Sequence, residues 1–298
     1  MLQAAAAAAG AQHYPTGALY VVATPIGNLA DITLRAVHVL ALVDAVACED
    51  TRHSAPLLRQ LGIDGKTLIA LHQHNEREAA AGVLLRLARG ERVAYVSDAG
   101  TPGLSDPGAA LVAAVHAAGY RAVPIPGASS ATAALSVAGD PAGAAFAFVG
   151  FVPPRAGERA LALQRVSSEP RTQVLFEAPH RIDALAAALA EACGARQLTV
   201  CRELTKQFET VQTLRADELP GWLGADRNRS RGEFVLVVHA LAAGSVDTAA
   251  TAHDATLRTL LDALPLKQAV AIAAELTGAA RNALYERALA LKGAARDA

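Results

Sequence analysis

One loop constrains the fold of this chain more than any other stretch. Residues Ser97–Gly108 read S-D-A-G-T-P-G-L-S-D-P-G and lie between a β-branched run at Arg92–Val96 and an apolar helical pattern at Ala109–Ala118. Glycine permits positive φ and close approach of a ligand to the backbone, whereas proline stiffens a loop. Open α/β sheets bind their ligands in loops at the carboxyl ends of strands. The stretch therefore predicts an α/β fold with a small-molecule site at this loop.

The same order of strand, loop and helix recurs along the first half of the chain. Short apolar runs alternate there with helical patterns, at 19–23, 45–48, 67–71, 92–96 and 121–125. This alternation predicts a mostly parallel sheet covered by helices. Loops at 24–29, 49–52, 97–108 and 126–130 follow strands, so we expect them to gather along one edge of that sheet. No G-x-G-x-x-G or G-x-x-x-x-G-K-[ST] motif occurs, which excludes a standard dinucleotide site and a P-loop.

The rest of the chain predicts a second α/β unit and a helical end. Strands are expected at 146–151, 173–176, 197–201, 209–214 and 233–239, followed by a small-residue linker at 240–252. Helices near 253–263, 265–276 and 279–292 are broken by Pro265 and Gly278. The expected parts are a disordered extension (1–16), two α/β domains (17–140 and 141–240) and a helix-turn-helix-like domain (253–298). The last pair of helices fits an ordinary αα hairpin as well as an RNA-docking element.

Composition limits the kinds of partner and compartment. The 298 residues carry a formal net charge of −1, so any nucleic acid would be held by a local patch of cations. Three widely spaced cysteines without C-x-x-C indicate a reducing cytosol and no disulfide framework. The Ala-rich start has no lysine or arginine before Arg35 and is interrupted by polar residues and prolines, which argues against a signal peptide or a membrane span. His72-x-His74 lacks a third ligand, so no metal is expected.

Seven motifs together resemble one family. They are T-P-I-G-N-L-A-D-I-T (24–33), E-D-T-R (49–52), S-D-A-G-T-P-G-L-S-D-P-G (97–108), P-G-A-S-S-A (126–131), F-E-A-P-H-R (176–181), C-R-E-L-T-K (201–206) and R-G-E-F-V (231–235). In this order they are similar to those of the bacterial 16S ribosomal RNA (cytidine-2′-O)-methyltransferases, in the tetrapyrrole-methylase superfamily. The chain departs from the family pattern in its Ala-rich extension and in Arg231, where lysine is expected.

The resemblance implies an architecture and an activity. We expect two α/β domains of the tetrapyrrole-methylase type with S-adenosylmethionine in the cleft between them, and a small C-terminal helical domain. The implied reaction transfers a methyl group to the ribose 2′-oxygen of a decoding-centre cytidine in 16S ribosomal RNA. The implied partners are that RNA or the small ribosomal subunit and a second copy of the chain in a cytoplasmic homodimer.

Site residues are carried over position by position from the matching motifs. Those expected at the cofactor are Ile26, Gly27, Asp98, Gly100, Thr101, Gly103, Leu104, Ser129, Ser130, Phe151 and Ala178. Because a ribose hydroxyl must lose its proton to attack, Asp50 and Lys206 are the candidate catalytic bases. Phosphate contacts are expected from Arg52, Arg181, Arg202 and Arg231.

Alternative interpretations stay open for these residues. Ser129 and Ser130 fit a helix N-cap pair, E-D-T-R fits a helix N-terminus, and each arginine fits an ordinary ion pair. For the whole chain, one alternative is a small-molecule tetrapyrrole methylase, although the first and central loops depart from the motifs of those enzymes. The other is a non-catalytic module that binds S-adenosylmethionine or the ribosome.

Overall fold

The computed structural model of the chain describes residues 1–72, 75–241 and 253–294. By its internal contacts the chain separates into two compact units, Met1–Ala240 and Leu241–Ala298. Nearly all of the expected linker, residues 242–252, lies outside the described residues. The first unit holds two five-stranded sheets, as expected for two α/β domains. The boundary predicted near residue 140 between these domains stays a prediction.

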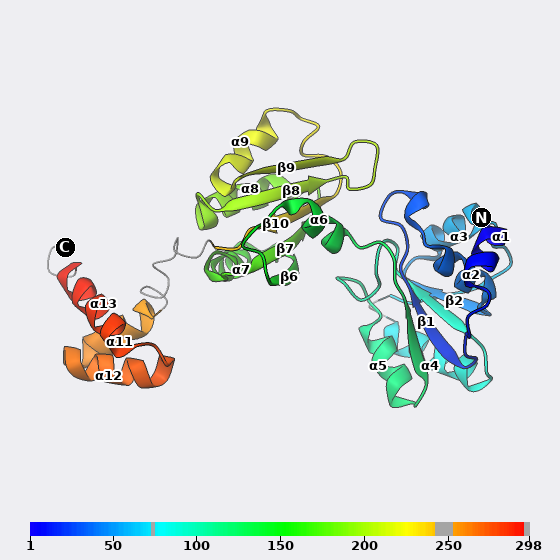
Figure 1. Cartoon of the computed structure of the whole chain (residues 1–298), viewed down its shortest axis with the longest axis horizontal. Helices are drawn as coiled ribbons and strands as arrows, with labels where there is room; N and C mark the ends of the chain where they lie inside the picture. The colour runs from blue at the N-terminus through cyan, green and yellow to red at the C-terminus, as the bar shows by residue number, and fades with distance from the viewer. Residues whose placement is uncertain (73–74, 242–252, 295–298) are drawn as a thin grey trace. The chain divides into compact units, whose positions relative to one another are not determined.

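The first sheet is entirely parallel, which confirms the expectation from the alternating pattern. Its strands run in the order β3-β2-β4-β1-β5. They are β1 (Ala18–Val22), β2 (Ala45–Cys48), β3 (Thr67–Ala70), β4 (Val93–Val96) and β5 (Arg121–Ile125). The helices that follow them are α2 (Leu34–Leu42), α3 (Thr51–Gln60), α4 (Glu76–Ala88), α5 (Ala109–Ala117) and α6 (Ser130–Ala138), with a 3-10 turn at Leu29–Asp31 (Figure 1).

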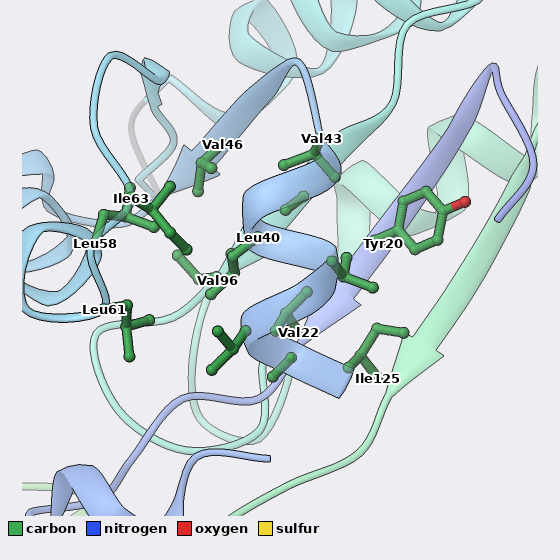
Figure 2. Close-up of a cluster of buried hydrophobic side chains, with 14 of the residues drawn as sticks. Tyr20, Val22, Leu40, Val43, Val46, Leu58, Leu61, Ile63, Val96 and Ile125 are labelled. Atoms are coloured by element: carbon green, nitrogen blue, oxygen red, sulfur yellow. The ribbon is translucent and has the colours of Figure 1, made fainter. Parts of the chain in front are cut away.

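Alternate residues of the first sheet build one core on each of its faces. Tyr20 and Val22 point to one face, whereas Leu19 and Val21 point to the other, because successive strand side chains alternate. Figure 2 shows Leu40 of α2 among the strand residues of the first core. Residues of α4 and α5 supply the second core. Burial on both faces explains why these strands read as continuous apolar runs.

The first sixteen residues correct the sequence prediction. A helix, α1 (Leu2–Ala9), occupies much of the segment expected to be a disordered extension. Ala5 and Ala9 are buried, and the helix packs against α2. The Tyr14 hydroxyl donates to the carbonyl of Ala9 at 3.0 Å, and this hydrogen bond holds the residues that follow α1 against the end of the helix. Alanine has the highest helix propensity and its small side chain allows close packing, so an alanine run need not be disordered.

The second sheet is mixed and has the order β6-β7-β10-β8-β9. Only β6 and β7 pair in parallel, while β10 lies antiparallel between β7 and β8. The strands are β6 (Phe146–Phe151), β7 (Thr172–Glu177), β8 (Gln197–Arg202), β9 (Thr210–Arg215) and β10 (Phe234–Val238). One face is covered by α7 (Ala156–Ser168), α8 (Ile182–Cys193), α9 (Leu219–Gly224) and the 3-10 turn Ala216–Glu218.

The other face of the second sheet is covered from the N-terminal half of the chain. Ala131, Ala134 and Ala138 of α6 pack with Val235 and Val237 of β10 in one core. Figure 1 shows α6 beside β10 of the second sheet. Ile26, from the loop after β1, belongs to the same core. The two sheets are thus joined through the small residues of α6, and the loops that precede this helix lie beside the second sheet.

The second unit is a bundle of three short helices. They are α11 (Asp254–Ala263), α12 (Leu266–Thr277) and α13 (Arg281–Ala294), as the breaks at Pro265 and Gly278 predicted. Leu257, Val270 and Leu284 form its small core together with Ala273 and Ala288. The Arg287 guanidinium donates two hydrogen bonds to Asp254, at 2.8 and 2.7 Å. Residues 295–298 of the expected domain lie outside the described residues. In the described segments, every helix is too short or too polar to cross a bilayer.

Candidate active site

A cavity of about 400 Å³ opens where the loops of the first sheet meet the second sheet. The loop after β1, the central loop after β4 and the start of α6 supply one side of its lining. The turn after β7 and the ends of β8 and β10 supply the other side. The residues expected at the cofactor that line it are Ile26, Asp98, Gly100, Thr101, Leu104, Ser129, Ser130, Phe151 and Ala178. Three of the four loops expected to gather at one edge of the parallel sheet, 24–29, 97–108 and 126–130, line this cavity, whereas the loop 49–52 does not.

Two glycines expected at the cofactor lie elsewhere. Gly103 borders a different hollow beside α5, and among the described residues other than Gly103 and its two neighbours, no heavy atom lies within 4 Å of the position its Cβ would take. A Cβ on Gly27 would lie 2.5 Å from Cγ of Lys206, so this glycine allows the lysine stem to pack against the backbone. A motif shows that a loop approaches a site, but it does not show which residues face the site.

Sequence reasoning missed much of the second-sheet side of the cavity. The further lining residues are Ala99, Ser105, Asp106, Phe176, Glu177, Pro179, Cys201, Leu204, Glu233, Phe234 and Val235. Most of them belong to motifs that were already visible, F-E-A-P-H-R, C-R-E-L-T-K and R-G-E-F-V. The missing information was the antiparallel insertion of β10 between β7 and β8, which brings these three motifs to one place.

Hydrogen bonds hold the central loop in shape. Thr24 and Gly100 exchange backbone hydrogen bonds of 2.9 and 3.1 Å, which tie the loop after β1 to the central loop. The Thr101 hydroxyl donates to the carbonyl of Ala128 at 3.0 Å, and this hydrogen bond connects the central loop to the loop before α6. Gly100 has φ of +82°, a conformation that favours glycine. These hydrogen bonds therefore connect three of the loops at the cavity to one another.

The cavity is acidic. Four carboxylates line it, those of Asp98, Asp106, Glu177 and Glu233, and its lining within the described chain contains no lysine, arginine or histidine. Burial raises the pKa of Asp106, and the nearby Asp98 raises it further. Burial also raises the pKa of the neighbouring Glu49, with a further contribution from Asp98 and Asp106. Such a lining attracts a cationic ligand and repels an anionic one.

Comparison with known proteins places the chain in a family. Residues 18–220 match the family Tetrapyrrole (Corrin/Porphyrin) Methylases, and residues 247–292 match the RsmI C-terminal HTH domain. The protein named Ribosomal RNA small subunit methyltransferase I of Escherichia coli O157:H7 is 46% identical over 278 residues, covering 93% of this chain and 96% of that protein. Its namesake in Pseudomonas aeruginosa is 47% identical over 279 residues, covering 93% and 98%. This chain belongs to the ribosomal RNA small subunit methyltransferase I family.

Solved structures similar to this family member share its fold. The methyltransferase CobJ superposes with a TM-score of 0.58 at 21% identity, covering 76% of this chain and 95% of that one. Uroporphyrin-III C-methyl transferase from Thermus thermophilus, solved with S-adenosyl homocysteine, gives a TM-score of 0.50 at 19% identity, covering 74% and 96%. These likenesses confirm the expected α/β architecture of the tetrapyrrole-methylase type.

In this methyltransferase I family member, Asp50 of E-D-T-R caps a helix. Its carboxylate accepts from the backbone N–H of Arg52 at 2.8 Å, at the N-terminus of α3, and from the Arg52 guanidinium. These hydrogen bonds lower the pKa of Asp50 to about 2, which makes it a weak proton acceptor. Asp98 accepts from the Asp50 N–H at 3.1 Å and pairs with His53 at 2.9 Å, which raises the pKa of His53. The structure therefore favours the helix-terminus interpretation of E-D-T-R over the catalytic one.

Lys206, the other candidate base, is held as a cation. Its Nζ lies 2.7 Å from Oε2 of Glu233 and 2.9 Å from Oε1 of Glu203. Burial opposes the charge, but the hydrogen bonds to the two carboxylates outweigh it and raise the pKa of Lys206. A protonated lysine cannot take up a further proton. The geometry therefore does not support the neutral lysine that the sequence interpretation required.

The four arginines expected at RNA fall into two groups. Arg181 pairs with Glu177 at 3.1 Å and donates to the carbonyl of Val152. Arg202 donates to the carbonyls of Arg231 and Phe208, and its buried Nε has no hydrogen-bond partner among the described residues. Both arginines therefore contact the protein's own loops. For Arg181, this contact is the ion pair that the alternative interpretation proposed. Arg52 and Arg231 are more exposed: the Arg52 side chain forms an ion pair with Asp50 but is 87% exposed, and Arg231 lies on the surface.

Metal binding finds no support in the parts of this family member that the structure describes. Within them, no group of three or more histidine, cysteine, aspartate or glutamate side chains could hold a metal ion. His74 of the H-x-H pair lies outside the described residues.

Proposed function

We propose that this chain transfers a methyl group from S-adenosylmethionine to the ribose 2′-oxygen of a decoding-centre cytidine in 16S ribosomal RNA. Membership of the ribosomal RNA small subunit methyltransferase I family supports the small-subunit RNA as substrate. The observation that supports binding of S-adenosylmethionine is the acidic cavity, which lies where the family's motifs meet. The position of the methylated atom rests on the resemblance of those motifs.

The lining suits the chemistry of S-adenosylmethionine. The cofactor carries a sulfonium and an ammonium cation and one carboxylate, so its net charge is positive. A lining with four carboxylates and no cationic side chain favours such a ligand, although Arg181 and Lys206 pair with two of these carboxylates from outside the lining. The rings of Phe151 and Phe176, whose centroids lie 5.7 Å apart, add aromatic surface that favours both apolar and cationic groups. Hydroxyls of Thr101, Ser129 and Ser130 could bond the ribose and amino-acid ends. When bound, the cofactor supplies the methyl group, and loss of the sulfonium charge on transfer weakens its attraction to the cavity.

The same proposal includes the partners and compartment that the resemblance implies, the small ribosomal subunit, a second copy of the chain and the cytoplasm. A small-molecule tetrapyrrole methylase is disfavoured, because relatives at 46% and 47% identity over 93% of the chain are named for ribosomal RNA. A non-catalytic module would bind S-adenosylmethionine or RNA without changing the RNA.

Mass mapping of ribosomal RNA from a strain that lacks this chain tests the function. We expect 16S RNA from the deletion strain to lose one 2′-O-methyl group, on a cytidine, and an intact copy of the chain to restore it. RNA that keeps all its ribose methyl groups would contradict the proposal. Loss of a methyl group from a base would place the chemistry on a different atom.

Arg231→Ala is expected to weaken RNA binding in a salt-dependent way. The chain has a net charge of −1, so its affinity for RNA must come from a few local cations. Loss of one phosphate contact should therefore reduce the slope of log affinity against log salt by roughly 0.7–0.9. Fluorescence anisotropy with a 16S RNA fragment measures the slope. Arg231→Lys keeps the charge and serves as the matched control. An alanine variant with the wild-type slope would show that Arg231 touches no phosphate.

A further inference from the structure

Among the four carboxylates that line the cavity, Glu233 alone extends well into solvent. Its side chain is 77% exposed, compared with 34% for Asp98 and 1% for Glu177. Asp106 is half-buried. A ribose hydroxyl that belongs to a large RNA can reach only a group at the cavity mouth. We infer that Glu233 accepts the proton of the ribose 2′-hydroxyl during methyl transfer, an inference that rests on the proposed function.

The backbone at Glu233 is fixed by its neighbours. The residue immediately precedes β10, and its N–H donates to Oε1 of Glu203 at 2.9 Å. Its carbonyl accepts from the N–H of Glu203 at 3.0 Å. Glu203 itself has φ of +52°, which is uncommon for a residue with a side chain. The R-G-E and C-R-E-L-T-K motifs therefore form one unit, which sets Glu233 beside the cavity.

Lys206 orients the Glu233 carboxylate. Its ammonium group lies 2.7 Å from Oε2, so Oε1 is the oxygen left to face an incoming hydroxyl. The lysine stem packs against Gly27, which connects the pair to the loop after β1. When the proton moves to Glu233, Lys206 keeps its 2.9 Å contact with Glu203, so the lysine charge stays paired throughout. This arrangement gives Lys206 a positioning role in place of the proton-accepting role considered for it.

The other cavity carboxylates are committed to structural contacts. Both oxygens of Asp98 are engaged, one by the Asp50 N–H and the other by His53. Glu177 accepts from the N–H of Ala178 at 2.8 Å and pairs with Arg181. Asp106 is half-buried in the central loop. None of these three combines an exposed carboxylate with a place at the cavity mouth, which leaves Glu233.

The proposed step balances in atoms and charge. The O–H bond of the 2′-hydroxyl breaks and its proton passes to Glu233 Oε1. The electron pair left on the ribose 2′-oxygen forms the new bond to the methyl carbon. The bond between the methyl carbon and sulfur breaks, and its electrons remain on the sulfur of the neutral thioether product.

Glu233→Gln tests this assignment with little change of shape. We expect the single-turnover rate at saturating RNA and S-adenosylmethionine to fall by about 10²–10⁴, the usual contribution of general acid–base catalysis. Dissociation constants for both ligands, from calorimetry and anisotropy, should stay close to wild type. Because the site is exposed, formate should restore part of the rate of Glu233→Ala. Glu209→Gln is the matched control, since Glu209 lies in the loop between β8 and β9 that also carries Lys206, accepts from Thr205 N–H at 2.6 Å and is absent from the cavity lining.

Two results would overturn the inference. One is a Glu233→Gln enzyme that methylates RNA at the wild-type rate. The other is a rate loss matched by an equal loss of RNA or S-adenosylmethionine affinity, which would make Glu233 a binding residue. In either case methylation by the wild type leaves the proposed function standing. A wild-type chain that transfers no methyl group to RNA would overturn that function and this inference together.

Discussion

Replacing Ala178 with tryptophan should abolish S-adenosylmethionine binding in a chain that still folds. Ala178 lines the cavity from the turn after β7, outside the strands and helices that carry the cores. An indole at this position would occupy much of the roughly 400 Å³ that the cofactor needs. We expect calorimetry to show affinity reduced at least about 100-fold, or roughly 2.8 kcal/mol at 1.4 kcal/mol per tenfold change.

The matched control for this substitution is Ala113→Trp. Ala113 is exposed on α5 and borders the separate hollow that also contains Gly103. This variant adds the same side chain outside the cavity and should bind the cofactor as the wild type does. If Ala178→Trp also bound normally while circular dichroism showed a native fold, the cofactor would have to occupy another site.

Arg181→Ala should destabilise the protein by about 3 kcal/mol, the lower end of the range for removing one partner of a buried ion pair. The Glu177 side chain is 1% exposed and that of Arg181 is 24% exposed, so the substitution leaves a carboxylate buried beside the cavity without its cation. Loss of the hydrogen bond from Arg181 to the Val152 carbonyl reduces the free energy of unfolding further. Urea unfolding should show a lower midpoint with an unchanged slope, which reports stability directly.

Arg52→Ala provides the comparison for this effect. The Arg52 side chain is 87% exposed and pairs with Asp50 at the surface, so its removal should cost less than about 1 kcal/mol. Equal stability of the two variants would contradict the structural role given to Arg181. The sequence interpretation instead expected Arg181 at an RNA phosphate, where alanine would flatten the salt dependence of RNA binding and leave S-adenosylmethionine binding intact.

Local patterns were sufficient to predict most of the fold. Strands β2, β5 and β6 have the predicted bounds, because each is a short apolar run closed by turn or charged residues. The central loop and the loop before α6 were placed at one cavity because parallel strands direct their carboxyl ends to one edge. Pro265 and Gly278 separated the terminal helices because each ends a helix by its own backbone chemistry. The alanine run of α1 was misread because its packing partner, α2, lies farther along the chain.

The sequence by itself determined most of the strands and helices, the parallel direction of the strands in the first half and the loops on one side of the cavity. Only the tertiary structure decided what individual side chains do there. Glu233 and Lys206 are 27 residues apart and meet because β10 pairs with β8, whereas Gly27 meets Lys206 across the two halves of the first unit. The physical reason is that conformational preference acts between neighbours in sequence, while charge pairing and burial depend on contacts that the chain makes only when it is folded.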